Sequence, residues 1–238
     1  HMPYHPPRRY IEQFAPHVLA DREAQTFLQR FNGDVYGWLA PLTGALDDHQ
    51  KQTLDGMYDA EVAYQDALLG QFFDRLQNSG QLDNTLVIIC ADHGEHLGEK
   101  QYMGHSLSIY NELVRVPLII RDPQNRLEQG SVVDSVVSTR RLFHTVLAAA
   151  GLANEKESAL DLVQSQGTPK ESDYVFAEAI PPQNVVNLMQ KRQPELVKEM
   201  GCDRVRRAVW MGQHKLIETE GSVAELYDVL EDPTEALD

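Results

Sequence analysis

Asp92, His93 and His105 are the side chains of this sequence best suited to chemistry. Asp92 and His93 are consecutive, and Gly94 lets the chain turn after them, so a carboxylate and an imidazole can face one cation. The carboxylate favours Ca²⁺, Mg²⁺ or Mn²⁺, whereas the imidazole also accepts Mn²⁺, Zn²⁺ or iron. The pair therefore predicts a metal site and leaves the metal open. A protonated imidazole at His105 would bind an oxyanion or protonate a leaving group.

The position of these residues supports that interpretation. They follow the apolar run Thr85 to Ala91, which is typical of a buried central strand. In open α/β sheets, ligands bind just beyond the carboxyl ends of such strands. We expect Glu95, His96 and Glu99, in the polar loop that follows, to be solvated, with substrate contact as the alternative.

Alternation of helical and extended patterns predicts an α/β domain over residues 1–151 and a small α+β subdomain over 152–238. Prolines predict an extended loop over residues 1–16. Asp47 and Asp48 can cap a long helix that reaches Asn78, with an apolar stripe at three- and four-residue spacing. The other expected elements are helices over 20–31, 139–150 and 183–199, strands over 117–121, 132–138 and 174–179, and a hairpin over 204–219.

Composition restricts the partners. The net charge of −15 argues against nucleic acid and against an anionic membrane surface. An anionic small substrate stays open, because a bound metal can reverse the local field. The two cysteines, Cys90 in the apolar run and Cys202 in a polar loop, indicate neither a disulfide framework nor a cysteine-rich zinc site. We expect neither a membrane span nor a signal peptide, and the compartment stays open.

Segments spread over almost the whole chain match one pattern in a fixed order. They are His1-x-Pro-Tyr-x-Pro-Pro, Asp83-Asn-Thr-Leu-Val, Ala91-Asp-His-Gly-Glu, Tyr110-Asn-Glu-x-Val-Arg-Val-Pro-Leu-Ile-Ile, Ser138-Thr139, Lys215-Leu-Ile, Glu225-Leu-Tyr-Asp and Asp232-Pro-Thr-Glu. In this order they resemble the sulfatase family of the alkaline-phosphatase superfamily. The resemblance implies part of the layered mixed sheet of that superfamily with flanking helices, plus a small C-terminal antiparallel sheet with a helix.

The resemblance also implies roles for the candidate residues. Asp92 and His93 match metal ligands, and His1 matches a sulfate-contacting histidine. His105 stands where many sulfatases have lysine, and it is expected to bind substrate and act in catalysis, as is His1. The implied cofactor is a divalent cation, with Ca²⁺ as the first choice and Mg²⁺, Mn²⁺ or Zn²⁺ as alternatives.

The resemblance covers only the latter part of the family pattern. The family nucleophile lies in Cys/Ser-x-Pro-x-Arg, where the Cys or Ser becomes formylglycine, and neither Cys90 nor Cys202 heads such a motif. Asp47-Asp48 resemble the N-terminal metal-binding aspartates of the family only in composition, and a helix cap is expected instead. We therefore expect a fragment of a sulfatase that is inactive alone, with formylglycine in the N-terminal part that is missing here.

Two alternatives remain. The first is a phosphodiesterase, phosphonate monoester hydrolase or phosphotransferase of the same superfamily, which the Asp-His pair and His105 also fit. The second is a noncatalytic domain that has kept the fold. The expected partner is a small-molecule sulfate or phosphate ester whose alcohol part stays open, and self-association through an exposed face of the core is a further expectation.

Overall fold

The computed structural model describes residues 1–34, 38, 44–165, 174–222 and 224–236. They form two compact units, each built from segments that are separate in the sequence. Unit 1 comprises residues 1–76, 93–108 and 179–205, and unit 2 comprises 77–92, 109–178 and 206–238. The predicted boundary between residues 151 and 152 stays a prediction.

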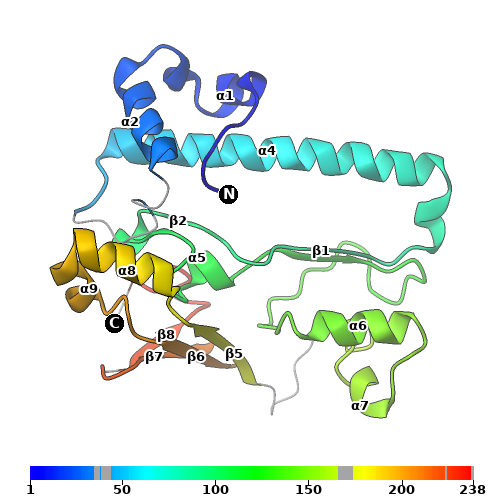
Figure 1. Cartoon of the computed structure of the whole chain (residues 1–238). Helices are drawn as coiled ribbons and strands as arrows, with labels where there is room; N and C mark the ends of the chain where they lie inside the picture. Colours follow the sequence, from blue (N-terminus) through cyan, green and yellow to red (C-terminus); the bar gives the residue numbers. More distant parts are fainter. Residues whose placement is uncertain (35–37, 39–43, 166–173, 223, 237–238) are drawn as a thin grey trace. The chain divides into compact units, whose positions relative to one another are not determined.

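Unit 1 is mainly helical and packs around α4, the long helix in Figure 1. Its core combines residues of the N-terminal segment, of α2, of the first turns of α4 and of β3. Its elements are α1 (Arg8–Phe14), η1 (Pro16–Leu19), α2 (Arg22–Gly33), α4 (Asp48–Asn78), β2 (His96–Leu97), η3 (Glu99–Gln101), β3 (Met103–Gly104), α8 (Gln183–Arg192) and α9 (Pro194–Met200), with the last two residues of α4 in unit 2.

Helix α1 corrects the prediction of an extended loop over residues 1–16. It begins directly after Pro7, whose φ of −60° is already compatible with a helix, and the seven residues that follow contain no proline. Proline disrupts a helix when it lies in the helix interior. It is tolerated at the position where a helix starts.

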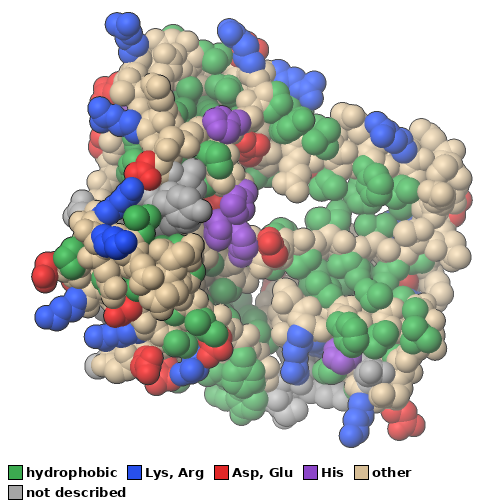
Figure 2. All heavy atoms as spheres, in the orientation of Figure 1, with side chains coloured by type: hydrophobic (Ala, Val, Ile, Leu, Met, Phe, Trp, Pro, Cys, Tyr) green, Lys and Arg blue, Asp and Glu red, His purple; other side chains and the backbone are tan. Residues whose placement is uncertain are grey.

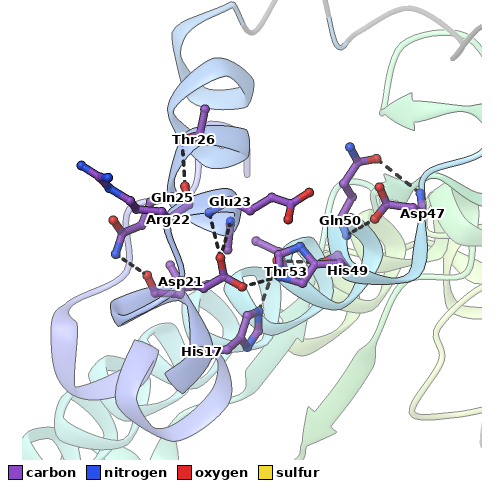
Figure 3. Close-up of polar contacts among 12 residues, drawn as sticks. His17, Asp21, Arg22, Glu23, Gln25, Thr26, Asp47, His49, Gln50 and Thr53 are labelled. Atoms are coloured by element: carbon purple, nitrogen blue, oxygen red, sulfur yellow. Dashed lines mark hydrogen bonds and ion pairs between the residues drawn. The ribbon is translucent and has the colours of Figure 1, made fainter.

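Side chains cap the two longest helices of unit 1, and the sequence predicts the cap of α4 (Figure 3). The carboxylate of Asp47 accepts a hydrogen bond from the N–H of Gln50 at 2.8 Å, and the Gln50 amide oxygen accepts one from the N–H of Asp47 at 3.3 Å. This reciprocal pair is a capping box, and it confirms the cap predicted for α4. Asp21 caps α2 through the N–H groups of Glu23 and Ala24, and its other oxygen lies 2.7 Å from Nε2 of His49.

The apolar stripe of α4 is buried only in its first turns. Leu54 is buried, whereas Val62 and Phe72 are 51% and 52% exposed. α4 has the length of a membrane-crossing helix but not the apolar character, and no described helix combines the two.

The described residues of unit 2 form two sheets. Strand β1 pairs antiparallel with β4, with Val87 opposite Arg121, and the other sheet has the strand order β5-β6-β7-β8. Its elements are η2 (Gln81–Asn84), β1 (Val87–Cys90), α5 (Asn111–Val114), β4 (Leu118–Arg121), α6 (Arg141–Ala149), α7 (Glu155–Ser158), β5 (Tyr174–Ala179), β6 (Arg206–Met211), β7 (His214–Thr219) and β8 (Glu225–Asp228), with Ala179 in unit 1.

The sheets of unit 2 confirm the mixed α/β class and the predicted hairpin, whose turn contains Gly212 at φ +61°. Three details differ from prediction. β1 is half-buried rather than buried, because within the described part of the chain it has a strand neighbour only in β4. The described residues 132–138 form no strand, and Val132 is 83% exposed. The single helix predicted over 183–199 is two, because Pro194 starts α9.

A buried ion pair joins distant parts of unit 2. Lys215 on β7 is fully buried, and its Nζ lies 2.5 Å from Oε1 of Glu235 and donates to the carbonyl of Ile109 at 2.8 Å. The second oxygen of Glu235 accepts the N–H of Asn111 at 2.7 Å. Burial lowers the pKa of Lys215, and Glu235 opposes that shift. The pair therefore fixes both β7 and the C-terminal turn to residues 109–111, which lead into α5.

A single buried histidine stands inside the hairpin of unit 1. The sequence led us to expect His96 at the surface, but its side chain is 1% exposed and its Nε2 lies 2.6 Å from Oγ of Ser108. Burial is the main cause that lowers the pKa of His96 to about 4, against the opposing charge of Glu99. His96 is therefore a neutral, structural residue at ordinary pH.

We expect Gly56→Ala in α4 to destabilise the protein by about 1–3 kcal/mol, because a side chain there overpacks the contact with the end of α1. A Cβ at Gly56 would lie 2.8 Å from the carbonyl oxygen of Phe14 and 2.9 Å from Cβ of Ala15. The control is Gly70→Ala in the same helix, where no atom lies within 4 Å. That variant is expected to stabilise by roughly 0.5–1 kcal/mol. Urea unfolding measures both, and equal effects would contradict the packing.

We expect Lys215→Met to cost about 3–5 kcal/mol, because it leaves the Glu235 carboxylate buried without its cation. The double variant Lys215→Met, Glu235→Gln should recover part of that loss, since the amide oxygen can still accept from Asn111. The matched control is the exposed pair of Arg207 and Glu178 in the same sheet. Arg207→Met should cost less than about 1 kcal/mol. A Lys215→Met variant as stable as Arg207→Met in chemical unfolding would show that the buried pair does not hold the unit together.

We expect His96 to make stability fall as the pH decreases from about 6.5 to about 4. In this window the unfolded chain protonates His96 while the folded state, with a pKa of about 4, holds it neutral, so the unfolded state binds more protons. The difference corresponds to about 3 kcal/mol at the acid end. Thermal unfolding of His96→Gln should show a flatter pH dependence than the parent, whereas the exposed control His5→Ala should keep the parental slope. Parallel curves for parent and His96→Gln would rule the effect out.

Candidate functional site

The candidate site of unit 1 is built on the hairpin of β2 and β3. His96 pairs with Gly104 and Leu97 with Met103, so the next pair outward is Glu95 and His105. The connecting turn is tight, with Gly98 at φ +109° and Lys100 and Gln101 at φ +50° and +63°. Such conformations disfavour ordinary side chains, and the surrounding structure must hold them. Register and turn together bring residue 95 beside residue 105.

Glu95 and His105 form a short polar contact at the open end of this hairpin. Oε1 of Glu95 lies 2.7 Å from Nδ1 of His105, and the two side chains are 3% and 21% exposed. The expectation of a solvated Glu95 is therefore wrong, because the hairpin register turns its carboxylate towards His105 and away from water. A carboxylate at Nδ1 orients the imidazole and favours the tautomer with the proton on Nδ1.

The N-terminal segment brings His1 to the same place. The side chain of Asn32 holds the backbone of Tyr4 by two hydrogen bonds, of 3.0 and 2.9 Å. Met2 and Tyr4 are buried in the core of unit 1, and the Tyr4 ring stacks on Phe31. Burial, and after it the charge of Glu95, holds the pKa of the Tyr4 phenol well above its usual range, so the phenol stays protonated beside that carboxylate.

Three histidine rings lie close together, and one of them, that of His105, contacts Glu95. The ring centroid of His105 lies 4.2 Å from that of His93, nearly parallel to it, and 4.6 Å from that of His1. One potential ligand atom from each of the three lies within 4.8 Å of the other two. Histidine side chains are seen gathered on the face drawn in Figure 2. The structure thus brings together three of the four predicted site residues.

Asp92, the fourth, is an exposed residue at a bend after β1, and it belongs to unit 2. Burial, and after it the charge of Asp92, raises the pKa of the Cys90 thiol. Cys90 is half-buried, whereas the sequence led us to expect it in the core. The other cysteine, Cys202, is buried. The role of Asp92 as a metal ligand stays a prediction.

Sequence reasoning gave Glu95 only as an alternative substrate contact, and it missed Tyr4 as part of this site. A signal for Glu95 was present, since residues 95 and 105 lie symmetrically about a glycine-containing turn and a short antiparallel pair would bring them together. The sequence carries no comparable signal for Tyr4, because the proximity of Tyr4 to Glu95 depends on packing between segments that are far apart in sequence.

Comparison with known proteins identifies the family of this chain. The family model described as Sulfatase matches residues 1–152. An arylsulfatase of Clostridium perfringens is 24% identical over 185 residues, which is 75% of this chain and 38% of that protein. Arylsulfatase K of Bos taurus is 30% identical over 141 residues, 59% of this chain and 26% of that protein. The chain therefore spans well under half the length of the curated relatives it matches.

Solved structures show the same fold. The phosphonate monoester hydrolase of Agrobacterium radiobacter aligns with a TM-score of 0.63 at 24% identity, over 81% of this chain and 38% of that one. A protein solved in complex with its substrate D-glucosamine-2-N,6-O-disulfate aligns with a TM-score of 0.61 at 22% identity, over 89% of this chain and 40% of that one. With the family model covering more than half of its residues, this chain belongs to the sulfatase family, within the alkaline-phosphatase superfamily.

Proposed function

We propose that this chain supplies the later part of an active site that hydrolyses sulfate monoesters. The observation that carries the proposal is the meeting of His1, His93 and His105 within one unit of a chain of the sulfatase family. Sulfatase relatives, among them the arylsulfatases of Clostridium perfringens and Bos taurus, support a sulfuric ester hydrolase as the parent kind of enzyme. The ester in question is a small molecule, and its alcohol part is open.

In this proposal His105 is the catalytic acid. Its Nδ1 faces the carboxylate of Glu95, so Nε2 is the nitrogen left to contact substrate. A proton on Nε2 can pass to the ester oxygen as the bond from sulfur to that oxygen breaks. Glu95 acts as a positioning residue, because it fixes the ring and stabilises the imidazolium. His1 contributes a second ring beside His105, which suits a contact to the sulfate oxygens.

Asp92 and His93 are the proposed metal ligands. The donor set fits a divalent cation, since it joins a carboxylate to an imidazole at consecutive positions of the chain. Ca²⁺ is the first choice, and Mg²⁺, Mn²⁺ or Zn²⁺ are alternatives. A cation held there would polarise the sulfate oxygens and offset their charge, in a protein whose own net charge is −15.

We also propose that these 238 residues do not turn over substrate alone. None of their prolines stands in a Cys/Ser-x-Pro-x-Arg sequence, so the formylglycine nucleophile of the family has no counterpart among them. Attack on sulfur needs that nucleophile, and the residues described here supply only binding and proton transfer.

A second candidate is hydrolysis of phosphonate monoesters or phosphodiesters. It is favoured by imidazoles at 93 and 105 and is compatible with the fold shared with the Agrobacterium radiobacter enzyme. A relative from Trinickia caryophylli, 29% identical over 106 residues, is described as a multifunctional protein of the superfamily. A noncatalytic domain is the outcome if neither ester is hydrolysed.

The test uses the polypeptide that joins this chain to a Cys/Ser-x-Pro-x-Arg segment. We expect His105→Ala to lower kcat for para-nitrophenyl sulfate by about 10²–10⁴-fold, as for removal of a general acid. Loss of an acid should matter more for phenyl sulfate, whose leaving group is poorer and needs protonation more. The control is His5→Ala, an exposed histidine of the N-terminal segment, which should retain parental rates.

The phenyl monoester of a phosphonic acid and the diester bis(para-nitrophenyl) phosphate are assayed in parallel. Faster turnover of these esters than of the sulfates would favour the second candidate. Equal losses for both sulfates in His105→Ala would contradict the role of His105 as an acid. Absence of turnover for every ester would leave the noncatalytic domain.

A further inference from the structure

The three histidines of unit 1 have a common arrangement that the proposed hydrolysis does not require. Each ring has an oxygen within hydrogen-bond distance of its Nδ1: the carbonyl of Met2 at 2.7 Å from His1, the carbonyl of Gly94 at 2.8 Å from His93, and the carboxylate of Glu95 at 2.7 Å from His105. An oxygen can only accept there, so Nδ1 carries the proton in all three rings. In the neutral tautomer, Nε2 then holds a lone pair.

This is the pattern of metal-binding histidines. A ligating histidine donates its other ring N–H to a carboxylate or backbone carbonyl, which fixes the tautomer and makes the ligating nitrogen more basic. Here two partners are backbone carbonyls of the adjacent residue, and the third is a carboxylate that is 3% exposed. The orienting groups of a metal site are therefore in place around all three rings.

The spacing of the rings also suits one ion. Three imidazole nitrogens on a tetrahedral Zn²⁺ at 2.0–2.1 Å lie about 3.3 Å from one another. One ring nitrogen from each of His1, His93 and His105 lies within 4.8 Å of the other two, so the rings need only move closer together to share one ion.

We propose that His1, His93 and His105 form a binding site for one divalent transition-metal ion, Zn²⁺ or Cu²⁺, with an open fourth position. The choice of metal follows from the ligands, because three neutral imidazoles suit these ions and not Ca²⁺ or Mg²⁺, which need oxygen. The site differs from the cation site proposed at Asp92 and His93 in two of its ligands, His1 and His105, and Ca²⁺, the first choice there, is not suited to it.

Occupation of this site has a consequence for turnover, and only that consequence rests on the proposed function. His105 bound to a metal through Nε2 cannot give a proton to a leaving group, and His93 bound to Zn²⁺ is withdrawn from a hard cation. Zn²⁺ or Cu²⁺ would therefore inhibit the enzyme, and a chelator would restore it.

The test of binding uses the 238-residue chain without a histidine tag, with its α-amino group acetylated so that the amine cannot act as a ligand. Zn²⁺ alone is titrated against a chromophoric chelator, and Cu²⁺ is followed by electron paramagnetic resonance, where coordinated nitrogens split the signal. We expect one ion per chain. His1→Ala and His105→Ala should each weaken Zn²⁺ binding at least tenfold and remove one nitrogen from the Cu²⁺ spectrum.

Two further variants and one control define the site. Glu95→Gln should weaken Zn²⁺ binding by about 10–100-fold, as for loss of a partner that orients a ligating histidine, and should still fold with the parental circular dichroism spectrum. Asp92→Asn should leave Zn²⁺ binding unchanged while lowering Mn²⁺ binding. His5→Ala removes an exposed imidazole from the same N-terminal segment and should change neither.

The proposal is overturned if His1→Ala or His105→Ala binds Zn²⁺ as tightly as His5→Ala does. It is also overturned if Asp92→Asn weakens Zn²⁺ binding as much as His1→Ala, since the ion would then occupy the Asp92 and His93 site. Loss of Mn²⁺ binding alone in Asp92→Asn, with Zn²⁺ binding intact, supports both sites. Absence of Mn²⁺ binding in the parent, with Zn²⁺ bound by the three histidines, sustains this inference and counts against the metal ligands of the proposed function.

Discussion

The candidate site depends on one buried carboxylate. Glu95 is nearly inaccessible to water, and a buried charge is tolerated only where other groups replace its hydration. His105 supplies one such group through Nδ1, and the protonated phenol of Tyr4 lies close enough for the charge of Glu95 to raise its pKa. Because Tyr4 belongs to the N-terminal segment and His105 to the hairpin, solvating this carboxylate also brings His1 beside His105.

A second constraint is the hairpin turn, which determines which residues face one another. One residue more or fewer between β2 and β3 would change the pairing of Glu95 with His105 and turn their side chains to opposite faces. The left-handed conformations of Lys100 and Gln101 show that this turn is held against the preference of its own residues. The bond from Lys51 on α4 to Glu99, and that from the N–H of Leu97 to the same carboxylate, hold the turn in place.

Local sequence was sufficient for much of the fold. The cap of α4 at Asp47, the strand after Asn84, and the turn at Gly212 all follow from neighbours within a few residues, and the structure has them. Burial was predicted less well, because it depends on partners far away in the chain. Glu95 and His96 look like ordinary residues of a polar loop, and β1 looks like a central strand. The approach of His1 to His93 and His105 could be inferred only through family resemblance, since no local pattern links residue 1 to residue 105.

The pair of Lys215 and Glu235 bears on how the chain folds as it is made. Its carboxylate accepts the N–H of Asn111, 124 residues earlier. A ribosome releases the amino-terminal residues first. The segment at Asn111 therefore acquires this partner only after most of the second unit has been synthesised. Contacts between such distant residues slow folding, because the long intervening segment must be ordered first. Until residue 235 has been made, the segment at Asn111 depends on its other contacts alone.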